Sequence, residues 1–261
     1  MPAYGSPTSD LDDPVLDDTG RPVAVPPVVA RVVSLVPSLT ESIAVTAPGL
    51  LVGATDWCTH PEDLDVARIG GTKNPQVDHV LDLRPDIVIA NDEENRAVDL
   101  DGLRARGCAV WVTTPRSVPQ ALASLDRMLR VACRLARPAW LDAADESWRT
   151  SYDGPRRRAV IPIWRRPWMA LGCDTFAGDV LARLGVDNVL GRHTERYPRF
   201  DLDALPTYDL VVLPDEPYAF SPDDGPEMFP DADVRCVSGR DLTWYGPSLA
   251  EARTRLTEQL A

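Results

Sequence analysis

The middle of the chain, residues 117–154, repeats apolar positions with the period of a helix. The first set, spaced three or four residues apart as in an amphipathic helix, is Ala121, Leu122, Leu125, Met128, Leu129 and Ala132. Pro138 ends that helix and suits the start of another, because a proline in the first turn lacks only an N–H that would have no partner there. The same spacing then resumes, at Leu141, Ala144, Trp148 and Tyr152.

We interpret residues 138–153 as one continuous helix, which spans roughly 24 Å at about 1.5 Å per residue. This helix divides the chain into an N-terminal lobe (1–136), a connecting helix (137–154) and a C-terminal lobe (155–261). Two lobes joined in this way leave a cleft between them, and we expect the functional site to lie in that cleft.

Short apolar runs alternate with helical patterns on both sides of this segment. The runs predict strands at 22–26, 31–36, 51–54, 87–90, 109–113, 159–163, 209–213 and 234–237. A capping box at Ser38-x-x-Glu41 predicts the start of one helix, and Asp174 or Thr175 is expected to cap another over 175–184. The alternation predicts parallel strands with right-handed crossovers. The predicted fold class is therefore α/β, with two doubly wound parallel-sheet lobes joined by a single long helix.

Composition narrows the function classes. A net charge of −13 argues against nucleic acid, whose phosphates require lysine and arginine. The five cysteines are odd in number and lack a CxxC spacing, which argues against a disulfide framework or a structural zinc site. No run approaches the roughly eighteen apolar residues of a membrane helix. Residues 1–20 form an acidic lead-in without the features of a signal peptide. We therefore expect a cytoplasmic monomer that does not insert into a membrane.

The segments after the predicted strands are polar and rich in tryptophan. They are 56–61, 91–96, 114–116, 164–168, 214–218 and 240–245. Ligands of open parallel sheets bind beyond the carboxyl ends of the strands, so these segments are the candidate site. Aromatic faces with a few polar groups suit a large, flat, partly apolar ligand. The sequence contains no G-x-S-x-G, H-E-x-x-H or P-loop motif and hence no recognised catalytic constellation.

A family resemblance runs through these segments from Asp17 to the C-terminus. It is carried by RVVSLVPSLTE, GATDWCTHP, GGTKNP, LRPDIVIA and DTFAGDVLARLGVDNVL, in that order. Together they resemble the helical-backbone (class III) substrate-binding proteins of ABC importers, which take up cobalamin, ferric siderophores and haem. The chain is most similar to the vitamin B12-binding branch. The resemblance implies a periplasmic-binding-protein-like fold, a metal-chelate ligand, an ABC permease as partner and no required cofactor.

The resemblance also implies roles for particular positions. Trp57, Trp168 and Tyr197 match aromatic positions that line the corrinoid cleft of the B12-binding branch. Lys73 lies near another of these aromatic positions but is not aromatic itself. Two further positions match the glutamate that importer-dedicated members carry in each lobe to dock onto the permease, and both are aspartate here: Asp78 and Asp203.

Cys58 and His60 offer a thiolate and an imidazole to a metal, or an axial ligand to cobalt or iron. The competing interpretation is packing and hydrogen bonding, because two ligands are too few for a closed zinc site.

The other candidates also have two interpretations each. A polar cluster after one strand either faces a ligand or is a solvated loop; it contains Asn91, Glu93 and Glu94. Arginines at strand ends either clamp an anion or carry surface charge; these are Arg116, Arg165 and Arg166. We expect ligand contact from at least one tryptophan of the WRRPW loop, and the ligand-facing set is completed by Trp164, Glu216 and Trp244.

Two functional hypotheses follow. The first is a substrate-binding receptor, not an enzyme, that closes two lobes on a corrinoid, a ferric siderophore or haem. The alternative is a cytoplasmic enzyme or carrier on the same scaffold, which would use the polar loops 56–60 and 91–96 for acid–base chemistry.

Overall fold

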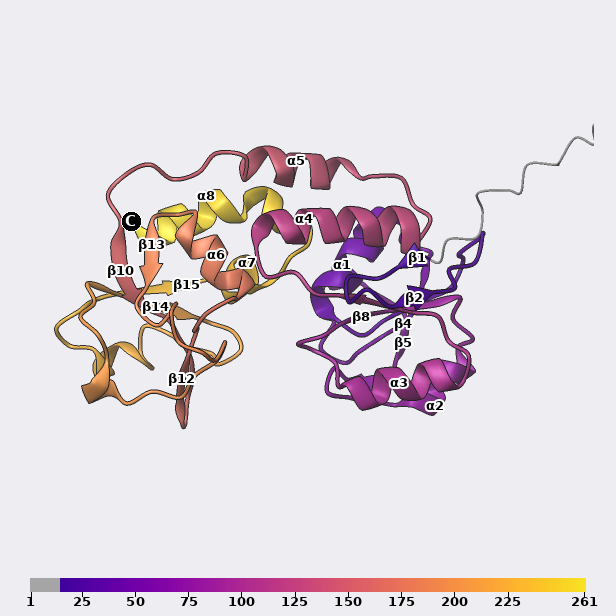
Figure 1. Cartoon of the computed structure of the whole chain (residues 1–261), viewed down its shortest axis with the longest axis horizontal. Coiled ribbons are helices and arrows are strands. Elements are labelled where there is room, and N and C mark those ends of the chain that lie inside the picture. The colour runs from indigo at the N-terminus through magenta and orange to yellow at the C-terminus, as the bar shows by residue number, and fades with distance from the viewer. Residues whose placement is uncertain (1–14) are drawn as a thin grey trace, which may run out of the picture.

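The computed structural model describes residues 15–261 and consists of two lobes side by side (Figure 1). The N-terminal lobe is built on a five-stranded parallel sheet, in the order β5 (Ala67–Arg68), β4 (Leu51–Ala54), β3 (Val32–Ser34), β8 (Ile87–Asn91) and β9 (Val110–Thr113). The C-terminal lobe has a four-stranded parallel sheet, in the order β13 (Val186–Asn188), β10 (Arg157–Val160), β14 (Leu210–Pro214) and β15 (Asp233–Val237). The predicted α/β fold class is confirmed.

Helices cover both faces of the first sheet. They are α1 (Pro37–Thr46), α2 (Val77–Asp82), α3 (Ala97–Ala105) and α4 (Val118–Arg127), the last continuing as a π-helix over Met128–Ala132. The remaining helices are α5 (Ala139–Ser147), α6 (Phe176–Ala182), α7 (Gly239–Thr243) and α8 (Leu249–Leu260), with 3₁₀ turns at Leu202–Ala204 and Pro226–Met228. In Figure 1, α5 bridges the top of the molecule above α4 and α8.

Three small antiparallel hairpins complete the fold. They are β1 (Val15–Leu16) with β2 (Pro22–Val23), β6 (Gly70–Gly71) with β7 (Asn74–Pro75), and β11 (Pro162–Arg165) with β12 (Trp168–Ala170). The first hairpin corrects the prediction of a polar lead-in over 1–20, because residues 15–20 are ordered by the side chain of Asp17; the earlier part of that segment lies outside the described residues.

The connecting helix is much shorter than predicted. Helix α5 ends at Ser147, so its nine residues span only about 13 Å. The chain then stops being helical because α8 satisfies the carbonyls at this end: Arg253 Nη1 donates to Ser147 at 2.9 Å and to Thr150 at 2.6 Å. The indole N–H of Trp148 also donates to the Leu249 carbonyl at 2.9 Å. The domain boundaries at 136/137 and 154/155 remain predictions.

One hydrophobic core runs through both lobes. It joins buried residues of the first sheet, of the bridging helices and of the second sheet, including Val32, Ile87, Leu125, Leu141, Ala159, Leu210 and Leu256. A second cluster lies between the first sheet and α2 and α3. The third lies under the other face of the second sheet, where loops and the β11–β12 hairpin replace helices. The lobes are therefore fused by packing and not only tethered by α5.

The predicted capping box does not form. Helix α1 begins two residues earlier than a Ser38 cap would place it, with Pro37 in its first turn and Val36 as an N-cap that has no side-chain bond. Ser38 and Glu41 are both buried within the helix. Among residues 15–261, no helix is long and apolar enough to cross a membrane.

Candidate functional site

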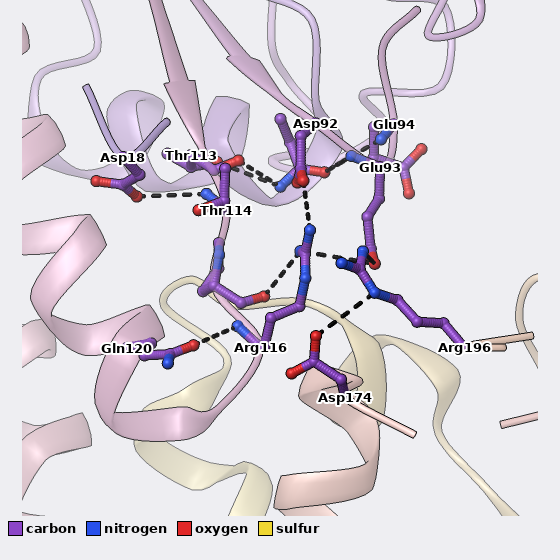
Figure 2. A network of polar contacts seen from close by, with 12 residues as sticks. Asp18, Asp92, Glu93, Glu94, Thr113, Thr114, Arg116, Gln120, Asp174 and Arg196 are labelled. Carbon is purple, nitrogen blue, oxygen red and sulfur yellow. Dashed lines mark hydrogen bonds and ion pairs between the residues drawn. The ribbon is translucent and has the colours of Figure 1, made fainter. Parts of the chain in front are cut away.

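The polar loops after β8 and β9 meet the C-terminal lobe at the boundary between the lobes (Figure 2), and we call this region the cleft. Glu93, in the loop after β8, is the centre of this contact. Its Oε1 accepts from Nη1 of Arg196 at 2.8 Å, and its Oε2 accepts from the hydroxyl of Tyr197 at 3.0 Å. Arg116, in the loop after β9, brings Nη1 to 3.5 Å from the same carboxylate. The two lobes are thus joined across the cleft by one shared carboxylate.

Further ion pairs extend this network. Arg116 pairs with Asp92, and Arg196 Nε lies 3.6 Å from Oδ2 of Asp174. Lys73, from the β6–β7 hairpin, donates to the backbone carbonyl of Glu93. We call the seven charged residues of this region the cleft network: Lys73, Asp92, Glu93, Glu94, Arg116, Asp174 and Arg196.

The loop that carries Glu93 is held in place by buried amides. Asn91 accepts from the backbone N–H of Glu93 at 2.8 Å and of Glu94 at 3.1 Å, which forms an Asx turn. Its Nδ2 donates to the hydroxyl of Tyr245 at 2.7 Å, across the lobe boundary. Asn91 is buried and its side chain is occupied by these bonds, so it builds the site and does not face the ligand as predicted.

The loop after β9 is fixed in a similar way. Asp18 accepts from the backbone N–H of Thr114 at 3.3 Å, and the side chain of Gln120 accepts from the N–H of Arg116 at 2.8 Å. Figure 2 shows both contacts beside the ion pairs of Arg116. The β1–β2 hairpin therefore helps to place a charged group of the cleft.

Two groups of the cleft have perturbed pKa values. Desolvation, followed by the charge of Glu93, raises the pKa of the Tyr197 hydroxyl, although the residue is 37% exposed. Desolvation also raises the pKa of the Glu94 carboxyl, with Glu93 adding to the shift and Lys73 opposing it. Glu94 is exposed to solvent, so we attribute the shift to the protein that surrounds it in the cleft and expect water to moderate it. Both groups line the cleft and remain open to a ligand.

A second contact joins the lobes closer to α5. Glu41 of α1 pairs with Arg240 of α7, and the guanidinium of Arg240 lies 5.6 Å from the ring centre of Trp244. The indole N–H of Trp244 donates to Glu216 at 3.0 Å. His60, from the other lobe, meets the same indole edge to face at 5.5 Å. Two residues that sequence analysis selected separately, His60 and Glu216, thus both contact Trp244.

Cys58 and His60 have different surroundings. The Cys58 thiol is fully buried between the hydroxyls of Thr40 at 3.0 Å and Thr55 at 3.1 Å, and burial raises its pKa. A buried, protonated thiol is a poor metal ligand. Residues 15–261 contain no group of three or more His, Cys, Asp or Glu arranged to hold a metal ion. These surroundings favour the packing and hydrogen-bonding interpretation of Cys58, and its metal role stays a prediction.

The candidate tryptophans differ in how much of each ring is already covered. Trp57 is 67% exposed, with its indole next to Gly71 in the hairpin that carries Lys73. Trp164 is 41% exposed and packs edge to face on Tyr218 at 5.7 Å. Trp168 instead contacts three phenylalanines of the third hydrophobic cluster. Trp168 therefore packs within its own lobe while remaining partly exposed, and its place in the cleft lining stays a prediction.

The remaining predicted residues lie apart from the cleft network. Arg165 pairs with Asp224 and Glu227 inside its own lobe, so it is not available to clamp an anion. Arg166 is exposed at the turn of the β11–β12 hairpin. Asp78 and Asp203 are exposed, and Asp78 pairs with Arg106. Their docking role stays a prediction.

Three residues of these contacts were missed by sequence analysis, namely Glu41, Asp174 and Arg196, whereas Arg240 lies in the candidate segment 240–245. Asp174 and Arg196 follow no strand directly, and Glu41 was assigned to a helix cap. The signal available for Arg196 was its position next to Tyr197, which the family resemblance had already selected. A groove of about 820 Å³ opens beside the network, with Arg116 and Asp174 in its lining.

Comparisons with known proteins identify the fold. No family model matches the chain. The vitamin B12-binding protein of Yersinia pestis is 22% identical over 185 residues, which cover 67% of this chain and 65% of that protein. The matched part is thus slightly less than two thirds of the relative's length.

Solved structures match over nearly the whole chain. The periplasmic vitamin B12-binding protein BtuF of Vibrio cholerae superposes with a TM-score of 0.70 at 16% identity, covering 89% of this chain and 96% of BtuF. The chain has the class III substrate-binding fold. The periplasmic haem-binding protein BhuT, solved with two haems, matches at a TM-score of 0.71 and 21% identity, covering 88% and 97%. CeuE of Helicobacter pylori, solved with Ni(II), gives 0.77 at 13% identity, covering 95% and 89%.

These comparisons confirm the resemblance to class III substrate-binding proteins and correct one expectation. The expected cytoplasmic location rested on the first residues of the given sequence. BtuF and BhuT are both described as periplasmic, and this finding contradicts the expectation. The matched proteins are themselves named as binding proteins.

Proposed function

We propose that this chain is the substrate-binding protein of an ABC importer, working in the periplasm, and that it holds a corrinoid or a similar metal chelate between its lobes. The observation that carries the proposal is the cleft itself. A largely exposed indole, Trp57, lies beside the hairpin whose Lys73 contacts Glu93, and Glu93 is held from the other lobe by Arg196 and Tyr197. An exposed aromatic face next to fixed polar groups suits a large, flat, partly apolar ligand.

The proposal assigns the chain a binding role without acid–base chemistry. The carboxylate of Glu93 is already occupied by donors from both lobes, so it is not free to act as a general base. The names of the matched relatives, vitamin B12-binding and haem-binding protein, support the same ligand class. An ABC permease is the proposed partner, with Asp78 and Asp203 as the docking residues.

Titration of the purified protein tests the proposal. Cobalamin, haem and a ferric siderophore are added separately while tryptophan fluorescence and the melting temperature are followed. We expect at least one of them to quench fluorescence saturably and to raise the melting temperature. When the free ligand is at a hundred times Kd, binding should increase the free energy of unfolding by about 2.7 kcal/mol. Free N-acetyltryptophanamide, titrated in parallel, corrects for light absorbed by the ligand. No response to any of the three at about 100 μM, a concentration that would reveal even weak binding, contradicts the proposal.

A further inference from the structure

The cleft network contains more carboxylates than cations. Its cations are Lys73, Arg116 and Arg196, and its carboxylates are Asp92, Glu93, Glu94 and Asp174. The contact nearer α5 has the same excess, with Glu41 and Glu216 around a single arginine, Arg240. The cleft therefore presents more negative than positive charge to a ligand.

The cations of the network already have partners. Arg116 contacts Asp92 and Glu93, Arg196 contacts Glu93 and Asp174, and Lys73 donates to a carbonyl. An anionic ligand would have to replace these carboxylates, and the displaced carboxylates would then stand unpaired next to it. Such an exchange is unfavourable because a charge without its partner in a partly desolvated site is costly.

Glu94 is the carboxylate left over. Among residues 15–261 its side chain makes no hydrogen bond, and only its backbone N–H is held, by Asn91. It is exposed beside Glu93 in the same loop, and in Figure 2 its carboxylate points away from Arg116. A carboxylate in this position accepts a hydrogen bond from a donor on the ligand and repels a negative group.

We propose, resting on the function proposed above, that Glu94 and Glu93 make the cleft select metal chelates whose rim carries neutral primary amides and reject those with carboxylates in the same places. A primary amide has both an N–H₂ donor and a carbonyl acceptor. It can donate to Glu94 or Glu93 while accepting from Arg196 or Arg116, without breaking the ion pairs between them. A ligand carboxylate can only accept hydrogen bonds, so it can bind the arginines but is repelled by the negative charge of Glu94. Haem, with its two propionates, belongs to the rejected class.

The test compares two corrinoids that differ mainly in these groups, the amide form carrying in addition one aminopropanol substituent. Dicyanocobinamide carries amides around a corrin ring, and dicyanocobyrinic acid carries carboxylates on the same ring, with the same metal and axial cyanides. Calorimetric titration at pH 7.5 in low salt should give a Kd for the amide form at least about tenfold lower, because like-charge contacts in an interface cost this much or more. The ratio should shrink in 1 M salt, where the Debye length falls to about 3 Å.

Glu94→Gln is the decisive variant, because it keeps the shape of the side chain and removes its charge. It should tighten binding of the acid form and bring the two Kd values together. Glu258→Gln, the same change on the exposed side of α8, controls for net charge and should leave the ratio unaltered.

The two proposals fail differently. Binding of both corrinoids with equal affinity, or tighter binding of the acid form, overturns the selectivity and leaves the receptor function standing. If the ratio of the two Kd values is the same in Glu94→Gln as in the wild type, Glu94 does not determine the selectivity. If the protein binds neither corrinoid, the proposal that its ligand is a corrinoid is wrong, and the proposed selectivity for amides is wrong as well.

Discussion

A tryptophan serves packing or ligand binding according to what already covers its ring. Trp168 is stacked on Phe220, with the two planes 6° apart, and meets Phe229 edge to face at 5.7 Å. Trp57 has no such aromatic neighbour among the described residues and is 67% exposed. Because stacking surface already used inside a lobe is not available to a ligand, we expect the two residues to have separate roles.

Substitution of each tryptophan by alanine should separate these roles. Trp168→Ala should lower the free energy of unfolding by roughly 3 kcal/mol through the lost contacts and the cavity that remains. Trp57→Ala should change that free energy by less than about 0.5 kcal/mol and weaken ligand binding by at least about 2 kcal/mol, as for an aromatic anchor. Urea unfolding and ligand titration measure the two quantities. A Trp168→Ala protein with full stability and lost binding would place Trp168 in the cleft lining.

The chemistry of the site was partly predictable at the residue scale. Glu93, Arg116 and Tyr197 were selected from the sequence, two of them because ligands bind beyond the strands of parallel sheets. Arg196 was not, because it lies 103 positions from Glu93 and its importance comes only from the way the lobes meet. Contacts across two lobes leave no local pattern in the sequence.

At the scale of elements, the β1–β2 hairpin protects an exposed sheet edge. Strand β9 is the last strand of the first sheet and would leave its outer backbone groups unpaired. Asp18 donates its backbone N–H to the Val112 carbonyl at 3.1 Å, and the buried Asp17 carboxylate accepts from the Val112 N–H at 3.3 Å. The hairpin thus completes the edge with one backbone and one side-chain bond.

Removal of the Asp17 carboxylate should therefore destabilise the protein. Asp17→Ala leaves the N–H groups of Thr19, Arg21 and Val112 without this acceptor, and we expect a loss of about 1–3 kcal/mol. Asp101→Ala is the control, because the Asp101 carboxylate is exposed and its ion pairs are screened by solvent, so its loss should be much smaller. Chemical unfolding measures both. Equal losses in the two variants would show that the hairpin does not stabilise the sheet edge.

The sequence predicted the existence of elements better than their ends. The strands at 51–54 and 87–90 and the Thr175 cap were confirmed, since each depends on a local pattern. The end of α5 was wrong because Arg253, more than a hundred residues later, binds its last carbonyls. The capping box was wrong because Pro37 begins the helix and Glu41 pairs instead with Arg240 from the other lobe.

At the scale of the whole molecule, two kinds of contact hold the lobes together. The ion pair of Glu93 is partly exposed, so it contributes little to the free energy of unfolding. For the buried Glu41, the attraction of Arg240 is offset by the cost of removing both charges from water. The hydrophobic core runs without interruption from the first sheet through α4, α5 and α8 to the second sheet. Because burial of apolar surface contributes far more than screened charges, the core should set the orientation of the lobes.

This arrangement predicts a small closure on ligand binding, of a few degrees, because a packed interface resists large rotations. Small-angle X-ray scattering with and without saturating cobalamin should give radii of gyration that agree within error. The variant Glu93→Ala with Arg196→Ala removes the main contact across the cleft and leaves the core intact, so its radius of gyration without ligand should also equal that of the wild type. A clear increase in this variant would mean that the ion pairs, and not the core, hold the lobes together. A large decrease when cobalamin binds to the wild type would mean that the lobes hinge freely in spite of their shared core.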